Sequence, residues 1–235
     1  LNHGWCRRVA RIESSDFVNW SGSEVVIDGE SWEAQPYCMT VFPYAGIYLG
    51  LLVVHDQIID RAWTELAYSE DTRVWRRIDP GNALIGCSET ELDYDYGCVY
   101  ACSRPVFLDD EVRLYYGGSD WLHFGWRNGC LALATLRPDG FAGYCQINTR
   151  EAGRLITKLL AYRGEEIRVT ADVAPEGSMM VRILDCDGEV ITERNISSSI
   201  TDAVVMPASL DAANEIQIEF TVVAAKLFSF VLVSK

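Results

Sequence analysis

Positive charge is scarce in this sequence, where 20 lysines and arginines stand against 34 aspartates and glutamates and the formal net charge at pH 7 is −14. The basic residues gather in no cluster longer than Trp75-Arg76-Arg77. Because nucleic-acid binding depends on basic side chains that neutralise phosphates, this composition argues against a nucleic-acid partner and against an anionic membrane surface. An acidic, aromatic-rich protein suits neutral polar ligands such as sugars, although acidity alone also serves solubility.

Long hydrophobic runs are also missing, which excludes a membrane-spanning helix of about 18 or more apolar residues. None of the eight cysteines forms a Cys-x-x-Cys pair, and several lie inside apolar strand patterns. We therefore expect reduced, buried cysteines in a cytoplasmic protein, with disulfide bonds as the alternative. The histidines His3, His55 and His123 are too scattered to predict a metal site. No glycine-rich loop leads into a helix, so no cofactor is expected.

A short pattern, Ser-x-Asp-x-x-x-Trp, occurs at Ser14 to Trp20 and again at Ser69 to Trp75. A degenerate third copy runs from Thr135 to Phe141, and each copy follows an alternating, strand-like run. The aspartate carboxylate can accept backbone N–H groups across a tight turn, and the aromatic residue then opens the next strand. Repeats of four-stranded units at such intervals indicate the blades of a β-propeller.

Alternating runs and turn signals predict four-stranded blades at 36–80 and 95–146, preceded by a half blade at 5–28. After about residue 150 tryptophan disappears, and seven short aliphatic strands are expected up to Val233, with a hairpin turn at Asp187-Gly188. The predicted fold is all-β, a partial five-bladed propeller of about two and a half blades followed by a β-sandwich. The predicted domains are residues 1–148 and 149–235.

Four segments carry a resemblance to a known family. Ala10 to Trp20 is similar to the end of its third blade, where a strand leads into a Ser-x-Asp-x-x-x-Trp turn. Tyr37 to Pro43 is similar to a fourth-blade strand, and Asp95 to Ala101, with Arg113 to Gly118 as its partner, is similar to the fifth blade. In this order the segments resemble the C-terminal half of the five-bladed glycosidases of glycoside hydrolase family 32 and its family 43 relatives. The chain also resembles a group of bacterial propeller proteins that are similar to these glycosidases. This resemblance implies a bacterial, cytoplasmic protein.

The resemblance implies a carbohydrate-acting protein that is incomplete as a catalyst. The family's nucleophilic aspartate lies in a blade that would precede residue 1, and Tyr37 stands where the acid/base glutamate is expected. Glycoside hydrolysis needs two carboxylates about 5–9.5 Å apart. Asp95 and Glu33 are the candidate catalytic residues, with turn capping as the alternative role of Asp95. Whether this chain is an enzyme stays open.

The inner strands of propeller blades line a central funnel, and loops rich in aromatic residues often carry function. The hairpin connection 119–128 holds several such residues, for which a sugar-stacking wall, an oligomer contact or simple packing are the alternatives. Candidate substrate-binding residues are Tyr37, Tyr100, Trp121, His123, Trp126 and Arg127.

Two functions follow as hypotheses. The first is a glycoside-hydrolase-like protein that acts on or binds carbohydrate. The second is a non-catalytic binding or assembly module derived from a glycosidase, in which two chains pair through their open propeller edges to close one ring. The second hypothesis predicts a homodimer, since exposed strand edges otherwise favour uncontrolled association.

Overall fold

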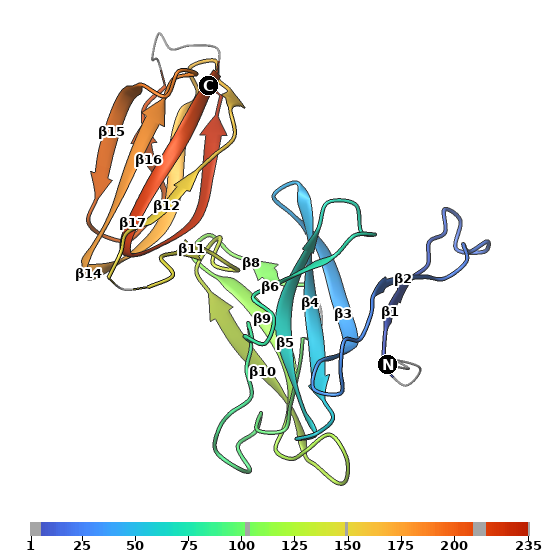
Figure 1. Ribbon diagram of the computed structural model, residues 1–235. Coiled ribbons are helices and arrows are strands. Elements are labelled where there is room, and N and C mark those ends of the chain that lie inside the picture. The colour runs from blue at the N-terminus through green and yellow to red at the C-terminus, as the bar shows by residue number, and fades with distance from the viewer. Residues whose placement is uncertain (1–5, 102–103, 149, 209–214, 235) are drawn as a thin grey trace. The chain divides into compact units, whose positions relative to one another are not determined.

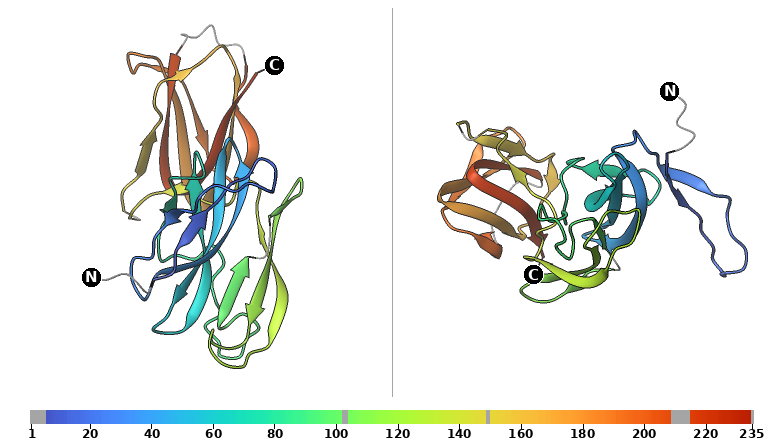
Figure 2. Two further views of the ribbon diagram at one scale, coloured as in Figure 1. Left: turned by 90° about the vertical axis from the view of Figure 1, so that its right-hand side faces the viewer. Right: turned by 90° about the horizontal axis from the view of Figure 1, so that it is seen from below.

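The computed structural model describes residues 6–101, 104–148, 150–208 and 215–234, and every helix or strand within them is a β-strand (Figures 1 and 2). The chain divides into two compact units, Leu1–Arg137 and Pro138–Lys235. Within the described ranges no helix could cross a membrane. The seven cysteines in these ranges are all free thiols, and Cys102 lies outside them. The expectation of buried cysteines is wrong for Cys38, Cys145 and Cys186, which are exposed.

The first blade is an antiparallel meander of four strands, β3 (Gln35–Tyr44), β4 (Ile47–Asp56), β5 (Arg61–Ser69) and β6 (Arg76–Ile78). Strand β4 is buried without interruption from residue 49 to residue 55. The sequence from Ile47 to Val54 is nearly continuously apolar, which predicts a strand covered on both faces, and the structure confirms this.

The second blade contains β7 (Cys98–Ala101), β8 (Val106–Phe107), β9 (Val112–Ser119) and β10 (Gly129–Leu136). Strands β7 and β8 follow one another along one edge of β9, and β10 pairs along the other edge. Among the described residues, the strands of the two blades pair at one parallel position, between β5 and β7. They are therefore joined mainly by side-chain packing.

That packing is centred on the shared pair, Ala62 and Cys98. Both are fully buried, together with Val53 of β4, and the partly buried Tyr100 packs against this cluster. The hydroxyl of Thr64 also donates a hydrogen bond to the Val99 carbonyl oxygen, at 3.1 Å. The inner ends of β4, β5 and β7 are therefore fixed relative to one another within this unit.

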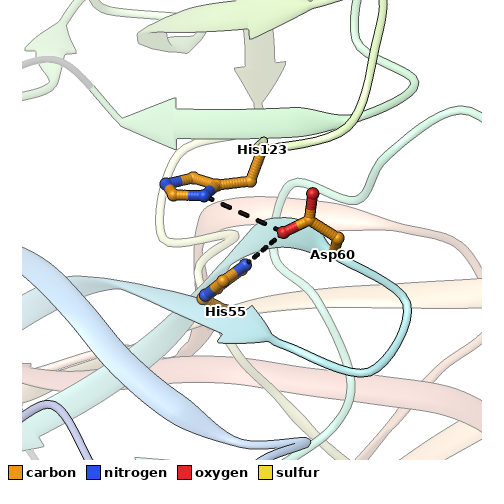
Figure 3. Close-up of side chains that lie close together, drawn as sticks. All are labelled: His55, Asp60 and His123. Atoms are coloured by element: carbon orange, nitrogen blue, oxygen red, sulfur yellow. Dashed lines mark hydrogen bonds and ion pairs between the residues drawn. The ribbon is translucent and has the colours of Figure 1, made fainter. Parts of the chain in front are cut away.

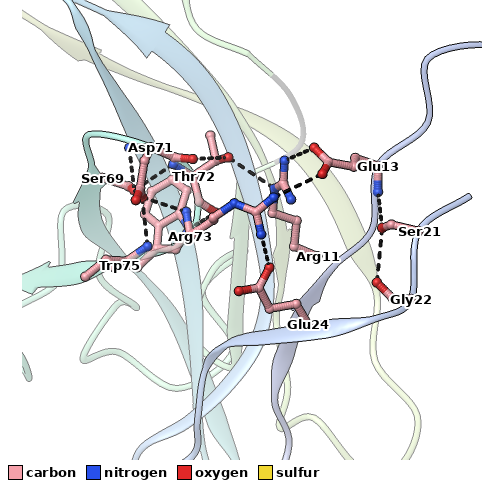
Figure 4. Close-up of polar contacts among 11 residues, drawn as sticks. Arg11, Glu13, Ser21, Gly22, Glu24, Ser69, Asp71, Thr72, Arg73 and Trp75 are labelled. Carbon is pink, nitrogen blue, oxygen red and sulfur yellow. Dashed lines mark hydrogen bonds and ion pairs between the residues drawn. The ribbon is translucent and has the colours of Figure 1, made fainter.

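A separate two-stranded sheet, β1 (Val9–Arg11) and β2 (Glu24–Ile27), precedes the first blade. The predicted half blade at 5–28 falls on this sheet, except for Trp5, which lies outside the described residues. Figure 4 shows how this sheet is tied to the first blade. Arg73, in the turn after β5, binds the carboxylates of Glu13 and Glu24.

Both copies of the Ser-x-Asp-x-x-x-Trp pattern form the same turn. In the first, Asp16 Oδ1 accepts the backbone N–H groups of residues 18 and 19, at 2.9 and 2.8 Å. In the second, Asp71 Oδ1 accepts those of residues 73 and 74, at 2.8 and 2.9 Å. The residue after each aspartate, Phe17 or Thr72, has a positive φ of 59° or 65°. The repeat is thus a structural device, as its residue types predicted.

The second unit is built from seven strands in one hydrogen-bonded network. Two of them are long and run through the centre, and the other five pair along their flanks. The strands are β11 (Tyr144–Cys145), β12 (Gly153–Ile156), β13 (Leu160–Ala161), β14 (Glu166–Leu184), β15 (Val190–Ile196), β16 (Ile200–Met206) and β17 (Glu215–Val233).

Strands β14 and β17 each replace two of the short strands expected from sequence. The first half of β14 pairs with the second half of β17 and with β16, and its second half pairs with the first half of β17 and with β15. Both strands bend where their register shifts, between Val173 and Ser178. Gly177 is required there, because a Cβ would lie 2.4 Å from the carbonyl oxygen of Ala224.

The two halves of these bent strands form the two layers of a β-sandwich around an aliphatic core. Its centre includes Ile167, Val169, Val181, Ile218 and Phe220, all at most 2% exposed. The turn at Asp187-Gly188 joins β14 to β15 as expected, and Gly188 has φ +85°. The predicted all-β class, with propeller-type blades followed by a sandwich, is confirmed, whereas closure of a five-bladed ring stays a prediction.

Candidate functional site

Tyr37, on β3, lies at the centre of a cluster of aromatic rings. Its ring centroid is 5.5 Å from that of Tyr100 and 5.2 Å from that of His123, and its hydroxyl lies 3.1 Å from His123 Nε2. The guanidinium of Arg7 lies over the Tyr37 ring, at 4.9 Å from the centroid. Tyr37 itself is 37% exposed, so this cluster opens to solvent.

His123 belongs to the loop 119–128, which is fastened to the turn between β4 and β5. The backbone N–H of His123 donates to the carbonyl oxygen of Asp60, at 2.9 Å, and that of Phe124 donates to Asp60 Oδ2, at 2.7 Å. Arg127 donates to the His123 carbonyl oxygen. One aspartate thus fixes the position of the loop that carries His123.

His55, at the end of β4, has a fully buried side chain between two charged groups. Arg7 Nη1 lies 3.0 Å from its Nδ1, and Asp60 Oδ1 lies 3.2 Å from its Nε2. Since a guanidinium can only donate, Nδ1 accepts and Nε2 carries the proton that is donated to Asp60. This arrangement describes a neutral imidazole in one defined tautomer.

The charge environment agrees with neutral imidazoles at both histidines. Burial lowers the pKa of His55, with Arg7 adding to this effect and Asp60 opposing it. Burial also lowers the pKa of His123, helped by the proximity of His55. The two imidazole rings lie 4.5 Å apart, centroid to centroid, so protonating both would place like charges side by side.

Figure 3 shows the side chains of His55, Asp60 and His123 converging from β4, from the turn after it and from the loop 119–128. These are residues that could hold a metal ion, because their ligand atoms all lie within 4.8 Å of one another. The histidines are too scattered along the sequence to predict a metal site, yet His55 and His123 lie close together in the structure. Chain folding brings together residues 68 positions apart, which no local pattern reveals.

The two candidate catalytic carboxylates lie in other surroundings. Asp95 is 8% exposed and accepts a 2.8 Å hydrogen bond from the Tyr116 hydroxyl. Glu33 is exposed in the segment before β3. Among the described residues, no contact joins either carboxylate to Tyr37 or His123.

Trp121 and Trp126 line a hollow of about 380 Å³ beside the loop, together with Asp120, Arg127 and Asn128. Trp126 is 88% exposed, whereas Trp121 is partly buried. Arg127 lines this hollow and also bonds the backbone of His123. The six candidate substrate-binding residues therefore form two groups, one around Tyr37 and one around Trp126, which share this loop.

Arg7, His55 and Asp60 take part in the site but are not among the binding candidates that the sequence patterns indicate. Asp60 gives one sequence signal, since it closes a short turn that begins at Asp56, directly after His55. Asp60 also has a positive φ of 57°, which is uncommon for a residue with a side chain. Arg7 gives no local signal, because its role depends on how the N-terminal segment packs on β3 and β4.

Comparison with known proteins finds distant structural likeness only. No family model matches the sequence, and no curated protein matches it. The GH32 beta-fructofuranosidase of Bombyx mori aligns with a TM-score of 0.38 and 12% identity over 97% of this chain and 61% of that chain. A mutant of the same enzyme in complex with sucrose gives 0.38 and 12% over 94% and 60%. A protein described as a glycoside hydrolase gives 0.37 and 10% over 95% and 65%.

The chain thus spans about three fifths of the length of these enzymes. At such scores neither their substrates nor their catalytic residues transfer to this chain.

Proposed function

We propose that this chain binds carbohydrate through the loop 119–128 and the neighbouring face of Tyr37. The observation that carries the proposal is the meeting of Tyr37 and Tyr100 with His123, which supplies ring faces and hydrogen-bonding groups in one place. Aromatic rings pack on the apolar faces of sugars, while phenol, imidazole and guanidinium groups bond sugar hydroxyls. Trp126 and Arg127 extend the same surface along the hollow beside the loop.

Binding is favoured over hydrolysis because of the carboxylates. A glycosidase places two of them about 5–9.5 Å apart on either side of the scissile bond. Around Tyr37 and His123, the contacts among described residues include one carboxylate, Asp60, which is already engaged by His55 and by the backbone of Phe124. A role for Asp95 or Glu33 in turnover is the alternative, and it requires a substrate that reaches them.

The test is a titration of the purified chain with neutral mono- and oligosaccharides. Binding is measured by NMR of the protein signals and by calorimetry. Trp126→Ala and Tyr37→Ala are expected to weaken binding at least about tenfold, within the range found for stacked aromatic residues at binding sites. Trp20→Ala is the matched control, because Trp20 is also exposed, at 49%, but lies after β1 in the separate sheet. Equal affinities in all three variants would refute this site.

The same samples are assayed for reducing-sugar release. Absence of turnover in a chain that binds sugar agrees with a binding module. If the wild-type chain releases reducing sugar, and Asp95→Asn or Glu33→Gln loses this turnover but keeps sugar binding, the chain is a hydrolase and the binding-module hypothesis is wrong.

Self-association is a second candidate function, favoured by the exposure of large apolar side chains around the β1–β2 sheet. Phe17 is 83% exposed and Val18 78%, and several neighbours are more than 40% exposed. Exposed apolar patches of this kind commonly mark protein interfaces. Such a face suits the pairing of two chains. The prediction that a homodimer closes one propeller ring requires a surface of this kind.

Light scattering tests this second candidate. A homodimer has twice the chain mass of 26.3 kDa. The double variant Phe17→Ser, Val18→Ser is expected to convert it to monomer. Ile147→Ser, at an exposed apolar residue outside the β1–β2 sheet, is the control and is expected to leave the mass unchanged. A monomeric wild-type chain would exclude homodimerisation as the function of this face.

A further inference from the structure

The cluster of His55, Asp60 and His123 offers three metal-ligating atoms at nearly the spacing that one cation needs. Donor atoms bound at about 2.0–2.1 Å to a tetrahedral Zn²⁺ lie about 3.3 Å from one another. Asp60 Oδ1 lies 3.2 Å from His55 Nε2 and 3.9 Å from His123 Nδ1. Side-chain shifts of about an ångström would complete the geometry.

Burial makes this cluster unlike an ordinary group of surface side chains. His55 is 0% exposed, His123 12% and Asp60 18%. Water therefore has limited access to the three ligand atoms, which come from three different segments of the first unit. Buried imidazole and carboxylate groups held this close together are typical of catalytic zinc sites, which use three protein ligands and leave a fourth position open.

The Nδ1 atom of His123 is an independent sign of a missing partner. It is buried and has no hydrogen-bond partner, since its nearest carboxylate oxygen is too distant at 3.9 Å. Buried polar atoms in proteins are nearly always satisfied. If His123 Nε2 carries the proton and donates it to the Tyr37 hydroxyl, the lone pair of Nδ1 faces Asp60, and a cation there would satisfy it. Tyr37 then acts as the outer hydrogen-bond partner that orients a metal-bound imidazole.

Arg7 is the one feature of the cluster that opposes a metal ion. A metal on His55 Nε2 requires the imidazole proton to move to Nδ1, where it would face the Arg7 guanidinium at 3.0 Å. Arg7 must then leave this position, although it can keep its contact with the Tyr37 ring or with Gln35. No net proton is released, because the proton moves between the two nitrogens of one ring. The Arg7 charge and a metal ion are thus alternative partners for the His55–Asp60 pair.

We propose that His55 Nε2, Asp60 Oδ1 and His123 Nδ1 form a binding site for one Zn²⁺ ion, with Arg7 as the competing cation. Two imidazoles and a carboxylate suit Zn²⁺ and its neighbours Co²⁺ and Ni²⁺ better than Mg²⁺ or Ca²⁺, which prefer oxygen ligands. A fourth coordination position is left for solvent or a ligand oxygen. The proposal does not depend on carbohydrate binding.

Metal binding is measured on the full chain by calorimetry with Zn²⁺ alone, and by visible spectroscopy with Co²⁺. Because the chain has eight cysteines, thiolate binding must be distinguished from the proposed site. Nitrogen and oxygen ligands give cobalt d–d bands without the sulfur-to-cobalt charge-transfer band that thiolates add. The expected result is one bound ion per chain with no thiolate band.

Four variants test the ligands and the competitor. His123→Ala and His55→Ala are expected to abolish the stoichiometric site, and Tyr37→Phe to weaken it about 10–100-fold, as loss of an outer hydrogen-bond partner does. Arg7→Met, which removes the charge but keeps an aliphatic chain over Tyr37, is expected to tighten it. His123→Ala serves better than a change at Asp60, because Asp60 also holds the loop backbone.

Circular dichroism establishes that each variant is folded before titration. No Zn²⁺ binding by the wild-type chain overturns the proposal. So does binding that His123→Ala leaves unchanged, and so does a cobalt spectrum dominated by thiolate.

Discussion

The hydroxyl of Tyr116 and the carboxylate of Asp95 form a 2.8 Å hydrogen bond in the interior of the second blade. Both residues are buried. Burial raises the pKa of Tyr116, helped by Asp95, so its hydroxyl stays protonated and keeps donating. Asp95 therefore has a structural task whatever else it does.

Replacing Asp95 by alanine is expected to destabilise the first unit by about 1–3 kcal/mol, because the buried Tyr116 hydroxyl loses its acceptor. Tryptophan fluorescence during urea unfolding measures this, since all seven tryptophans lie at or before residue 126. Asp95→Asn keeps an acceptor oxygen and is expected to lose less. An Asp95→Ala variant as stable as the wild-type chain would contradict the structural role of Asp95 and favour its alternative role as a catalytic carboxylate.

Glu65 carries the strongest prediction about stability in the first blade. Its carboxylate is 0% exposed and binds Arg77 at 2.7 Å, the indole N–H of Trp63 at 2.9 Å and the backbone N–H of Gly81 at 3.1 Å. Glu65→Ala leaves the Arg77 charge without its close partner, and the loss expected is about 3 kcal/mol.

The matched control is Glu24→Ala, whose exposed carboxylate also pairs with an arginine, Arg73. Exposed pairs contribute about 0–1 kcal/mol, so this variant should unfold close to the wild-type urea concentration. Equal losses in the two variants would mean that burial does not set the strength of the Glu65 pair.

The turn of the repeated pattern is testable through Asp71. Its Oδ1 accepts two backbone N–H groups, and these hydrogen bonds lower the pKa of its carboxyl. Asp71→Ala removes the acceptor and is expected to lower the melting temperature, whereas Asp71→Asn retains an oxygen and is expected to lower it less. Thermal unfolding followed by tryptophan fluorescence compares the three proteins, with Trp75 inside the affected turn.

Glu219 predicts a pH dependence in the sandwich. Burial alone would raise the pKa of Glu219, but hydrogen bonds from Arg154 and Arg182 outweigh it and hold the pKa below its ordinary value. A depressed carboxyl pKa stabilises the fold above the unfolded-state value, about 4.3, and this stabilisation is lost as the pH falls through the lower folded-state value. Acid unfolding of the second unit, followed by its amide NMR signals, should therefore shift to higher pH in Glu219→Gln.

The exposed Glu176→Gln is the control for this shift, because no ion pair of Glu176 occurs among the described contacts. An unchanged acid transition in Glu219→Gln would show that the two arginines do not contribute to acid stability.

Sequence patterns predicted what depends on neighbours along the chain. The turns at Asp16 and Asp71, the buried strand β4 and the hairpin at Gly188 all follow from local residue types. The six binding candidates lie on β3, on β7 or in the loop 119–128, and which of them meet depends on how these three segments pack. Function at these residues stays a prediction.

What the sequence could not provide is pairing at a distance. The last strand of the blade expected at 95–146 is β11, which pairs with β17 of the second unit. Two of the seven short strands expected after residue 150 are the two halves of β14, because Gly177 lets the chain bend without breaking the strand. Likewise the contact of Arg7 with His55 joins residues 48 positions apart. Each of these depends on tertiary packing, which no local pattern encodes.

The two bent strands have a consequence for how the sandwich comes apart. Strands β14 and β17 each run through both layers, so the two layers share their central strands. Opening one layer would strip the other of its central pair, so partial unfolding along the layer boundary has no stable product. Native-state hydrogen exchange should then give one common opening free energy for the amides of β14 and β17 on both sides of the bend.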